Sequence, residues 1–573
     1  MSIDWPTCGL PRIVFAMARL FGFALLITIA AARAYAAAVS GDKGVVATVH
    51  LLASEAGVRA LERGGNAIDA AVAAALTLGV VDGHNSGIGG GCFMLIRTAT
   101  GKFIALDGRE RAPAAASRDM FVREGKADPA LSQTGALAVG IPGSLAVYEH
   151  ALAQYGRLTL DSHLLAAAQI AEDGFQIDRT YANRLTATMA ELRRFQGSRK
   201  AFLKPDGSPF KAGELLRLPD LAASYRAIAQ QGTRWFYRGE FAAAVESWMA
   251  KNGGLATAND FAAYKFVQRE PIRTAYRGYE IVGFPPPSSG GVHVAQILNI
   301  LEQFPLNSMK PGSAEFIHVV TEAMKLAFAD RAHWLGDPDF VSVPGGLVSH
   351  EYAARLAQKI HLDRVTAVPQ HNTPPNSGSD VFQKHTTHFS TADRDGNWVA
   401  CTATINTSFG SKVVVPGTGI VLNNQMDDFS IQPGVSNYFG LIGAEANAVA
   451  PGKRPLSSMS PTIVLKDGQP LLSVGAAGGP TIISQTVLAI VNVVDFGMNI
   501  ETALNQPRFH HQWRPDELRI EKRVPAEVRQ KLEKLGHKLN VVESMGAAQA
   551  VAIESGKLAG VADPRSEGRA AGY

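Results

Sequence analysis

The chain of 573 residues has few cysteines, no blocks of like charge and no long low-complexity linker. Only three cysteines are present, and no set of Cys and His residues has the spacing of a zinc site. His510 and His511 are adjacent and would point to opposite faces of a strand, so we do not expect a metal there. Lys and Arg are scattered and the formal net charge is only +4, which argues against nucleic acid as a partner.

Two of the three cysteines lie in apolar, strand-like surroundings. Cys8 belongs to the N-terminal segment, whereas Cys92 and Cys401 lie within the body of the chain. We expect the last two to be buried free thiols, although the sequence leaves a disulfide open.

The N-terminal segment has the features of a targeting signal. Arg12 and Arg19 precede an apolar run over residues 20–30, and Ala34-Tyr35-Ala36 places small residues at the two positions that a signal peptidase reads. The run is too short to span a bilayer comfortably. We therefore predict a signal peptide over residues 1–36 and a periplasmic or secreted protein, with an uncleaved anchor as the alternative. No other segment of the sequence is a convincing membrane span.

The rest of the chain mixes helices and strands around a large core. Hydrophobic residues make up 46% of the sequence and charged residues 18%, as in a globular protein. Asn66 precedes an Ala-rich stretch with Asp69 in the capping-box position, which predicts a helix start. Residues 144–359 are mostly helical in pattern, including an amphipathic helix expected over residues 322–334.

A glycine-rich loop at residues 87–91 invites a phosphate-binding interpretation. Here the loop precedes a strand expected over Cys92 to Arg97, it does not open a helix, and no Lys-Ser or Lys-Thr follows it. We therefore expect these glycines to let backbone pass close to backbone.

The most informative stretch is Lys384-His385-Thr386-Thr387-His388-Phe389-Ser390 and the alternating runs that follow it. Asp395-Gly396 between these runs predicts a β-hairpin. A three-residue loop with a left-handed Gly396 sets Asp393 opposite Asn397 and Thr386 opposite Thr404, whereas a two-residue loop shifts the pairing by one. Thr is also a common strand residue, so the hairpin alone does not establish a catalytic role.

Cleavage of the chain before Thr386 would give this residue a free α-amino group beside its own hydroxyl. A Thr hydroxyl is a poor nucleophile by itself, and an N-terminal amine is a recognised base for it. The α-amino group titrates near pH 8 in model compounds, which suits it to work near neutrality. The preceding residues 371–383 are polar and rich in turn-forming residues, where a cut is tolerated.

Several motifs in the same order resemble the γ-glutamyltransferase (glutathione hydrolase) family. They are Thr386-Thr387-His388-Phe389-Ser390, Thr404-Ile405-Asn406-Thr407-Ser408-Phe409-Gly410, Asn423-Asn424-Gln425-Met426-Asp427-Asp428-Phe429, Arg454-Pro455-Leu456-Ser457-Ser458-Met459 and Pro507-Arg508-Phe509-His510-His511-Gln512-Trp513. The likeness runs from about Gly44 to Tyr573. It implies an α+β fold, the four-layer αββα sandwich of N-terminal-nucleophile hydrolases, self-cleaved into two subunits that share one core.

The resemblance also implies roles for individual residues. Thr386 is the nucleophile that first cleaves its own chain, Thr404 orients its side chain, and Gly478 and Gly479 form the oxyanion hole. The amino-acid head of the γ-glutamyl group is held by Arg109, Asn406, Gln425, Asp428, Ser457 and Ser458. Residues 434–452 resemble a lid loop, with Phe439 over the pocket. Asp427 is expected to support Asp428, and no cofactor is implied.

The implied reaction is acyl transfer from glutathione and other γ-glutamyl compounds to water, amino acids or dipeptides. The implied products of self-cleavage are a large subunit of residues 37–385 and a small catalytic subunit of residues 386–573, which stay together as a heterodimer. Two other functions remain open. An acylase of the same superfamily would cleave glutaryl side chains, and an exported solute-binding protein would remain one uncut chain.

Overall fold

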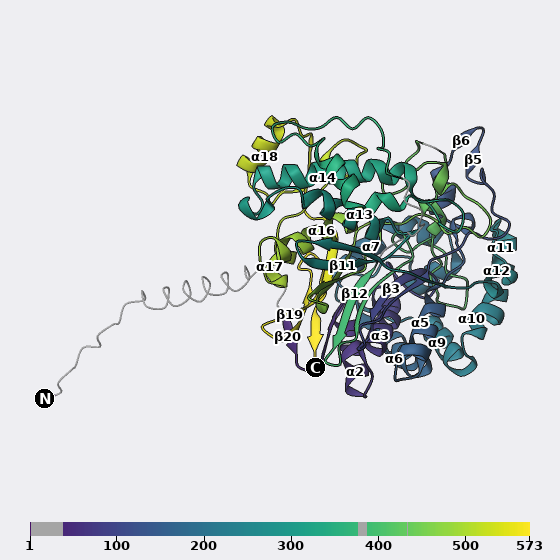
Figure 1. The fold of residues 1–573 in the computed structure, drawn as a ribbon. Helices are drawn as coiled ribbons and strands as arrows, with labels where there is room; N and C mark the ends of the chain where they lie inside the picture. The colour runs from purple at the N-terminus through teal and green to yellow at the C-terminus, as the bar shows by residue number, and fades with distance from the viewer. Residues whose placement is uncertain (2–37, 376–386, 433) are drawn as a thin grey trace.

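The computed structural model describes residues 1, 38–375, 387–432 and 434–573 (Figure 1). The predicted signal peptide and Thr386 itself therefore lie outside the described residues. Within the described ranges, no helix is both long enough and apolar enough to cross a membrane.

Two seven-stranded antiparallel sheets form the centre of the molecule (Figure 1). The first has the order β21 (Ala570–Gly572), β2 (Gly44–Ala47), β12 (His388–Asp393), β13 (Trp398–Thr404), β3 (Gly91–Arg97), β4 (Phe103–Gly108), β9 (Val267–Arg269). The second has the order β1 (Val39–Gly41), β20 (Lys557–Ala562), β19 (Ala547–Glu554), β15 (Gln469–Ala477), β14 (Thr462–Lys466), β11 (Tyr279–Gly283), β10 (Ile272–Tyr276). Each sheet thus combines strands from both sides of residue 386.

Helices cover the outer face of each sheet. On the first sheet lie α3 (Ala67–Val81) and α5 (Ser144–Tyr155), with α6 (Leu160–Asp173) against α3. On the second lie α13 (Ser289–Leu301) and α16 (Thr481–Val494), with α14 (Ala314–Trp334) against α13. The other helices of eight or more residues in the described ranges are α2 (Leu51–Glu62), α7 (Arg179–Arg193), α9 (Pro219–Gln231), α11 (Glu240–Asn252), α15 (His350–Ala357) and α18 (Ala526–Lys534).

Three apolar clusters fill the spaces between these layers. One cluster lies between the two sheets and includes Phe93, Trp398 and Ile463. The other two lie between each sheet and its helices. Sheet faces and helix faces must bury their apolar sides against one another, and this sequence does so in four layers. The predicted αββα sandwich is confirmed.

Of two local features that the sequence predicted, one is confirmed and the other is only partly correct. The capping box at Asn66 and Asp69 is present at the start of α3. The helix expected over residues 322–334 is present as the end of α14, which begins at Ala314, but its predicted amphipathic character is wrong, because α14 is buried on all sides from Phe316 to Arg331. It packs against α13 on one side and against α18 on another, so no face of this segment is left to solvent.

Candidate functional site

The predicted hairpin of β12 and β13 has the three-residue loop, one of the two loop lengths that the sequence left open. Ala392 is paired with Trp398, and the Asp393 N–H donates to the Asn397 carbonyl at 3.1 Å. Gly396 has φ +91°, the left-handed conformation that this loop requires. At the other end of the ladder, Thr387 and Ala403 exchange two backbone hydrogen bonds. The described residues resume at Thr387, which precedes β12 and directly follows the predicted nucleophile.

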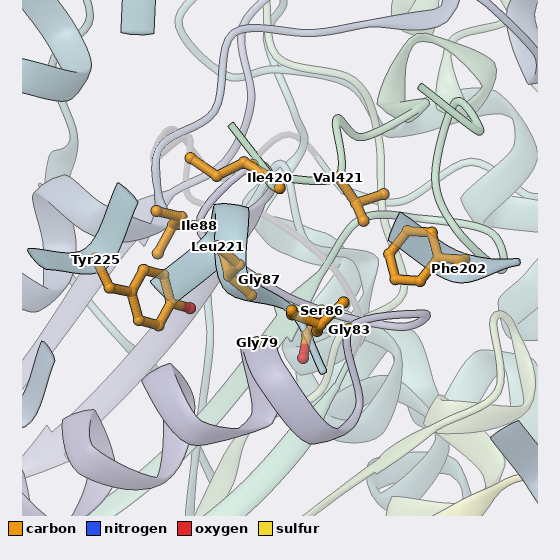
Figure 2. Close-up of a pocket in the computed structure, with 13 residues that line it drawn as sticks. Gly79, Gly83, Ser86, Gly87, Ile88, Phe202, Leu221, Tyr225, Ile420 and Val421 are labelled. Carbon is orange, nitrogen blue, oxygen red and sulfur yellow. The ribbon is translucent and has the colours of Figure 1, made fainter. Parts of the chain in front are cut away.

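The glycine-rich loop before β3 supports the end of β13. A Cβ atom on Gly90 would lie 1.8 Å from the Thr404 carbonyl oxygen, and one on Gly89 would lie 2.0 Å from that of Val421. The cavity beside this loop holds only about 10 Å³ and is lined by Gly79, Gly87 and Tyr225 among others (Figure 2). That space suits about one water molecule and no phosphate group. Close backbone contact is therefore the role of these glycines, as predicted.

A buried ion pair brings together residues that lie far apart in the sequence. Arg109 directly follows β4, and Asp428 ends the short helical turn Gln425–Asp428. Arg109 Nη2 donates to Asp428 Oδ2 at 2.6 Å, and Gln425 Nε2 donates to the same oxygen at 2.7 Å. All three side chains are buried. The structure thus brings together three of the predicted binding residues.

Around this pair, several polar atoms have no hydrogen-bond partner among the described residues. They are Arg109 Nη1, Gln425 Oε1 and Asn406 Oδ1. Buried polar groups are normally hydrogen-bonded, so unpaired ones in one region mark a place built for a ligand. The set offers a cationic donor for a carboxylate and two amide oxygens for an ammonium group.

Glu110 is a second buried acid beside Arg109, and no local pattern in the sequence predicts its burial. Its Oε2 lies 3.6 Å from Arg109 Nη1, and the side chain is fully buried. Burial raises the pKa of Glu110 to about 7, while the charge of Arg109 acts in the opposite direction. Arg109 is therefore held between two carboxyl groups, of which Glu110 titrates near neutrality.

Ser457 and Ser458 are buried on a segment that α13 and α14 hold in place. The Ser457 N–H donates to the Pro287 carbonyl at 3.1 Å, and the Ser289 N–H donates to the Ser457 carbonyl at the same distance. The loop before α13 therefore packs against the segment that carries Ser457.

Arg331 of α14 lies behind these serines and was not predicted from the sequence. Its Nε donates to Ser289 Oγ at 2.9 Å and its Nη2 donates to Ser458 Oγ at 3.3 Å. Burial lowers the pKa of Arg331 to about 10, and the nearby Asp428 acts in the opposite direction. Arg331 is the single arginine of α14 and directly follows Asp330, and no local pattern in the sequence indicates that it is buried.

Gly478 and Gly479 connect the end of β15 to the start of α16. Their φ values are +134° and +59°, both in the region that favours glycine, and Pro480 occupies the N-cap position of the helix. The N–H groups at a helix start carry partial positive charge. This location therefore provides backbone donors and a favourable helix dipole for a developing negative charge, which the predicted oxyanion hole requires.

The predicted lid residue Phe439 packs over these glycines. A Cβ atom on Gly479 would lie 2.6 Å from Phe439 Cδ1. Two acids anchor the segment: the Tyr438 N–H donates to Asp427 Oδ2 at 3.0 Å, and Asn437 Nδ2 donates to Asp428 Oδ1 at 3.3 Å. Asp427 thus contacts the segment that carries Phe439.

An open cavity of about 460 Å³ leads to this region. Thr387, Thr404, Asn406, Phe439 and the two glycines line it. Thr404 Oγ1 accepts the Asn406 N–H at 2.7 Å, and Asn406 adopts φ +78°, beyond the end of β13. Asn406 therefore reaches the cavity through a turn that follows β13.

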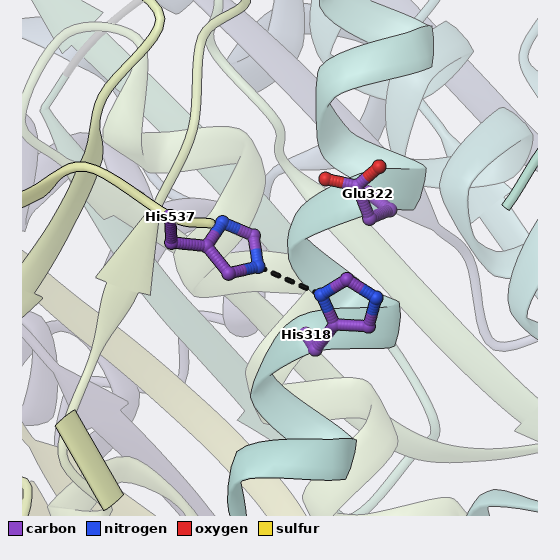
Figure 3. Close-up of side chains that lie close together, drawn as sticks. All are labelled: His318, Glu322 and His537. Atoms are coloured by element: carbon purple, nitrogen blue, oxygen red, sulfur yellow. Dashed lines mark hydrogen bonds between the residues drawn. The ribbon is translucent and has the colours of Figure 1, made fainter. Parts of the chain in front are cut away.

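One group of side chains elsewhere in the described ranges has metal-ligand chemistry (Figure 3). His318 and Glu322 lie one turn apart on α14, and His537 lies after α18. The two histidines form a hydrogen bond of 2.7 Å, and Glu322 accepts the Thr366 N–H and lies 3.3 Å from Lys325 Nζ. Each side chain therefore has a partner within the protein, and the group does not line the open cavity.

Comparison with known proteins identifies close relatives over nearly the whole chain. The family model described as Gamma-glutamyltranspeptidase matches residues 53–573. The glutathione hydrolase proenzyme of Escherichia coli (strain K12) is 45% identical over 539 residues, covering 93% of each chain. The acylase ACY 1 proenzyme of Pseudomonas sp. (strain V22) is 39% identical, covering 92% of this chain and 93% of that one.

Solved structures agree with the sequence comparisons. The cephalosporin acylase from Bacillus halodurans superposes with a TM-score of 0.84 at 32% identity, covering 94% of this chain and 97% of that one. The γ-glutamyltranspeptidase of Helicobacter pylori superposes with a TM-score of 0.55 at 41% identity, over 56% of this chain and 93% of that chain. The solute-binding alternative is therefore wrong. The chain belongs to the γ-glutamyltranspeptidase family of enzymes.

Proposed function

We propose that this enzyme cleaves the γ-glutamyl amide of glutathione and related compounds and passes the acyl group to water, amino acids or dipeptides. The observation that carries the proposal is the buried pair of Arg109 and Asp428 with its unpaired neighbours. A free amino acid has a carboxylate and an ammonium group on one carbon. A guanidinium meets the first with parallel hydrogen bonds, and a carboxylate with amide oxygens suits the second.

The roles of the binding residues follow from these chemistries. Arg109 Nη1 is the donor for the α-carboxylate, assisted by the hydroxyl groups of Ser457 and Ser458. Asp428, with the side-chain oxygens of Gln425 and Asn406, takes the α-ammonium group. The acyl chain then extends from this buried pocket toward the open cavity, which Thr404 and Gly478 line.

The proposed reaction has two halves. The Thr386 hydroxyl oxygen attacks the γ-carbonyl carbon while the Thr386 α-amine accepts the hydroxyl proton. Gly478 and Gly479 stabilise the tetrahedral oxygen, since no Cβ intrudes on their N–H groups. The C–N bond breaks, the amine portion leaves with a proton, and a γ-glutamyl ester on Thr386 remains. Water or an acceptor amine then attacks the ester and frees Thr386.

The same residue would first cut its own chain. Attack by the Thr386 hydroxyl oxygen on the carbonyl carbon of residue 385 would break the C–N bond, free the Thr386 α-amine and leave residue 385 as an ester on that oxygen. Water would then hydrolyse the ester and divide the protein into residues 37–385 and 386–573. Both sheets contain strands from each part, so the two subunits remain one folded unit after the cut. Removal of residues 1–36 as a signal peptide would place the enzyme in the periplasm or outside the cell.

A glutaryl-cleaving acylase is the second candidate, because relatives named as acylases are similar over most of the chain. Glutaryl donors lack the α-ammonium group, so Asp428 and Gln425 would have no ammonium group to bind. The test compares kcat/KM for γ-glutamyl-anilide and glutaryl-anilide. We expect γ-glutamyl-anilide to be preferred by roughly 100-fold or more, since a glutaryl donor has no ammonium group for the buried side-chain oxygens of Gln425 and Asn406, which have no hydrogen-bond partner among the described residues. A preference for glutaryl-anilide would contradict the proposed substrate.

A further inference from the structure

The open cavity extends well past the residues assigned to the acyl group. Beyond Thr404 and Gly478 it is lined by Asp82 at the end of α3 and by Asp178 and Arg184 at the start of α7. By contrast, Arg109, Gln425 and Asp428 do not line it. The pocket for the amino-acid head is thus buried behind Phe439, and the solvent-facing side of the site has charged residues of its own.

Two arginines line this cavity, and they differ in their partners. The guanidinium group of Arg565 is already ion-paired within the protein: its Nε and Nη2 donate to Glu521 at 2.6 and 2.7 Å, and its Nη1 lies 3.3 Å from Asp563. Arg184 is exposed and forms no side-chain hydrogen bond or ion pair with any residue that the structure describes. Arg184 is therefore the arginine here that is available to an anion.

The acids near Arg184 do not neutralise it directly. Asp178 is the N-cap of α7, and its Oδ1 accepts the Tyr181 N–H at 2.6 Å. Asp82 accepts from Asn85 Nδ2 at 2.9 Å, and its Oδ2 has no hydrogen-bond partner among the described residues. Burial raises the pKa of Asp82 to about 8, so this carboxyl group is largely uncharged at neutral pH. Asp178 and Glu567 also line the cavity, but among the described residues neither forms an ion pair with Arg184, so its guanidinium group remains available to a ligand.

The proposed reaction places a carboxylate in this part of the cavity. The portion that leaves a γ-glutamyl peptide is an amino acid or a short peptide, and its amide nitrogen lies next to the attacked carbonyl. Its C-terminal carboxylate must then extend away from the buried head pocket and toward solvent. The same holds for an amino acid or dipeptide that arrives as the acceptor.

We propose that Arg184 binds the C-terminal carboxylate of the leaving peptide and of the acceptor, and so favours peptide substrates over uncharged amides. This inference rests on the proposed γ-glutamyl transfer and concerns the solvent-facing side of the same site, where the leaving peptide and the acceptor bind. A guanidinium group meets a carboxylate with two parallel hydrogen bonds, which gives orientation as well as affinity. Orientation of the acceptor would direct its amine toward the acyl ester.

The test compares two donors that differ in one group, glutathione and glutathione whose glycine carboxylate is a carboxamide. In Arg184→Ala, we expect the ratio of kcat/KM for glutathione to that for the carboxamide to fall roughly tenfold, mainly through KM. Arg184→Lys should recover part of the ratio, because it keeps the charge and loses the fork geometry. Arg179→Ala is the matched control, since Arg179 is also exposed on α7 but does not line the cavity.

The outcomes separate the inference from the proposed function. A ratio that is unchanged in Arg184→Ala, or that falls equally in Arg179→Ala, would overturn the role of Arg184. Failure of the proposed function would appear differently, as a wild-type enzyme that cleaves neither donor. Self-cleavage into two subunits, seen on a denaturing gel, verifies that each variant has folded.

Discussion

At the scale of single residues, the site depends on charges held away from water. Arg109 is buried between Asp428 and Glu110, and Gln425 donates to the same oxygen of Asp428 as Arg109 does. Removal of one partner from a buried ion pair leaves the other charge without compensation and costs about 3–5 kcal/mol. The geometry of the head pocket is therefore tightly constrained, and small changes in charge should have large effects on substrate binding.

Asp428→Asn tests the assignment of the ammonium site. We expect kcat/KM for γ-glutamyl donors to fall roughly 100-fold or more, because the amide keeps the shape but loses the charge that pairs with both the ammonium group and Arg109. Steady-state kinetics of the self-cleaved variant measure this effect. The neighbouring Asp427→Asn is the control and should cost less than roughly tenfold, since Asp427 contacts Ser132 and Tyr438. Equal losses in both variants would contradict the choice of Asp428.

Glu110 predicts a pH-dependent stability. Its pKa is raised to about 7, chiefly by burial, so the folded protein retains a proton that the unfolded chain loses near its ordinary value of 4.5. Stability is therefore lost as the pH rises from about 4.5 to about 7, by up to about 3 kcal/mol. Glu110→Gln, which stays neutral, should have a higher Tm than the wild type at about pH 8.5, with little difference at about pH 4.5. A difference in Tm that is the same at both pH values would refute this account.

At the scale of secondary-structure elements, local sequence signals were sufficient to predict features that depend only on adjacent residues. The capping box at Asn66 and the hairpin around Gly396 were predicted because a cap and a tight turn depend on a few adjacent residues, although the length of the hairpin loop was left open. The burial of α14 was missed because helices from other parts of the chain cover it. Glu110 and Arg331 were missed for the same reason, since neither a charge nor its partners can be placed from local pattern alone.

The cap of α3 offers a prediction at this scale. Asn66 Oδ1 accepts the N–H groups of Ile68 and Asp69 at 2.8 and 3.2 Å. Asn66→Ala should destabilise the protein by about 1 kcal/mol, seen as a lower Tm, with kcat unchanged because α3 carries no reacting group. Asn66→Asp keeps an accepting oxygen and should cost less. The role of the cap would be refuted if the two variants lost equal stability.

At the scale of the whole molecule, the order of strands explains how one chain can be cut and remain one enzyme. β12 and β13 lie between β2 and β3 in the first sheet, so strands that follow residue 386 are enclosed by strands that precede it. The resemblance in sequence motifs predicted this fold, and the sheet order and the superposition on solved structures confirm it. The residue-level roles remain proposals, and they all require Thr386 to become a chain terminus.

The most direct test is the mass of the small subunit in the purified, self-cleaved protein. The account predicts a fragment of 188 residues (573 − 385) that begins with Thr386 and ends with Tyr573. Such a terminus would carry the α-amine that the proposed chemistry needs as its base. A small fragment that begins at any other residue, or an active enzyme that stays uncut, would contradict the account.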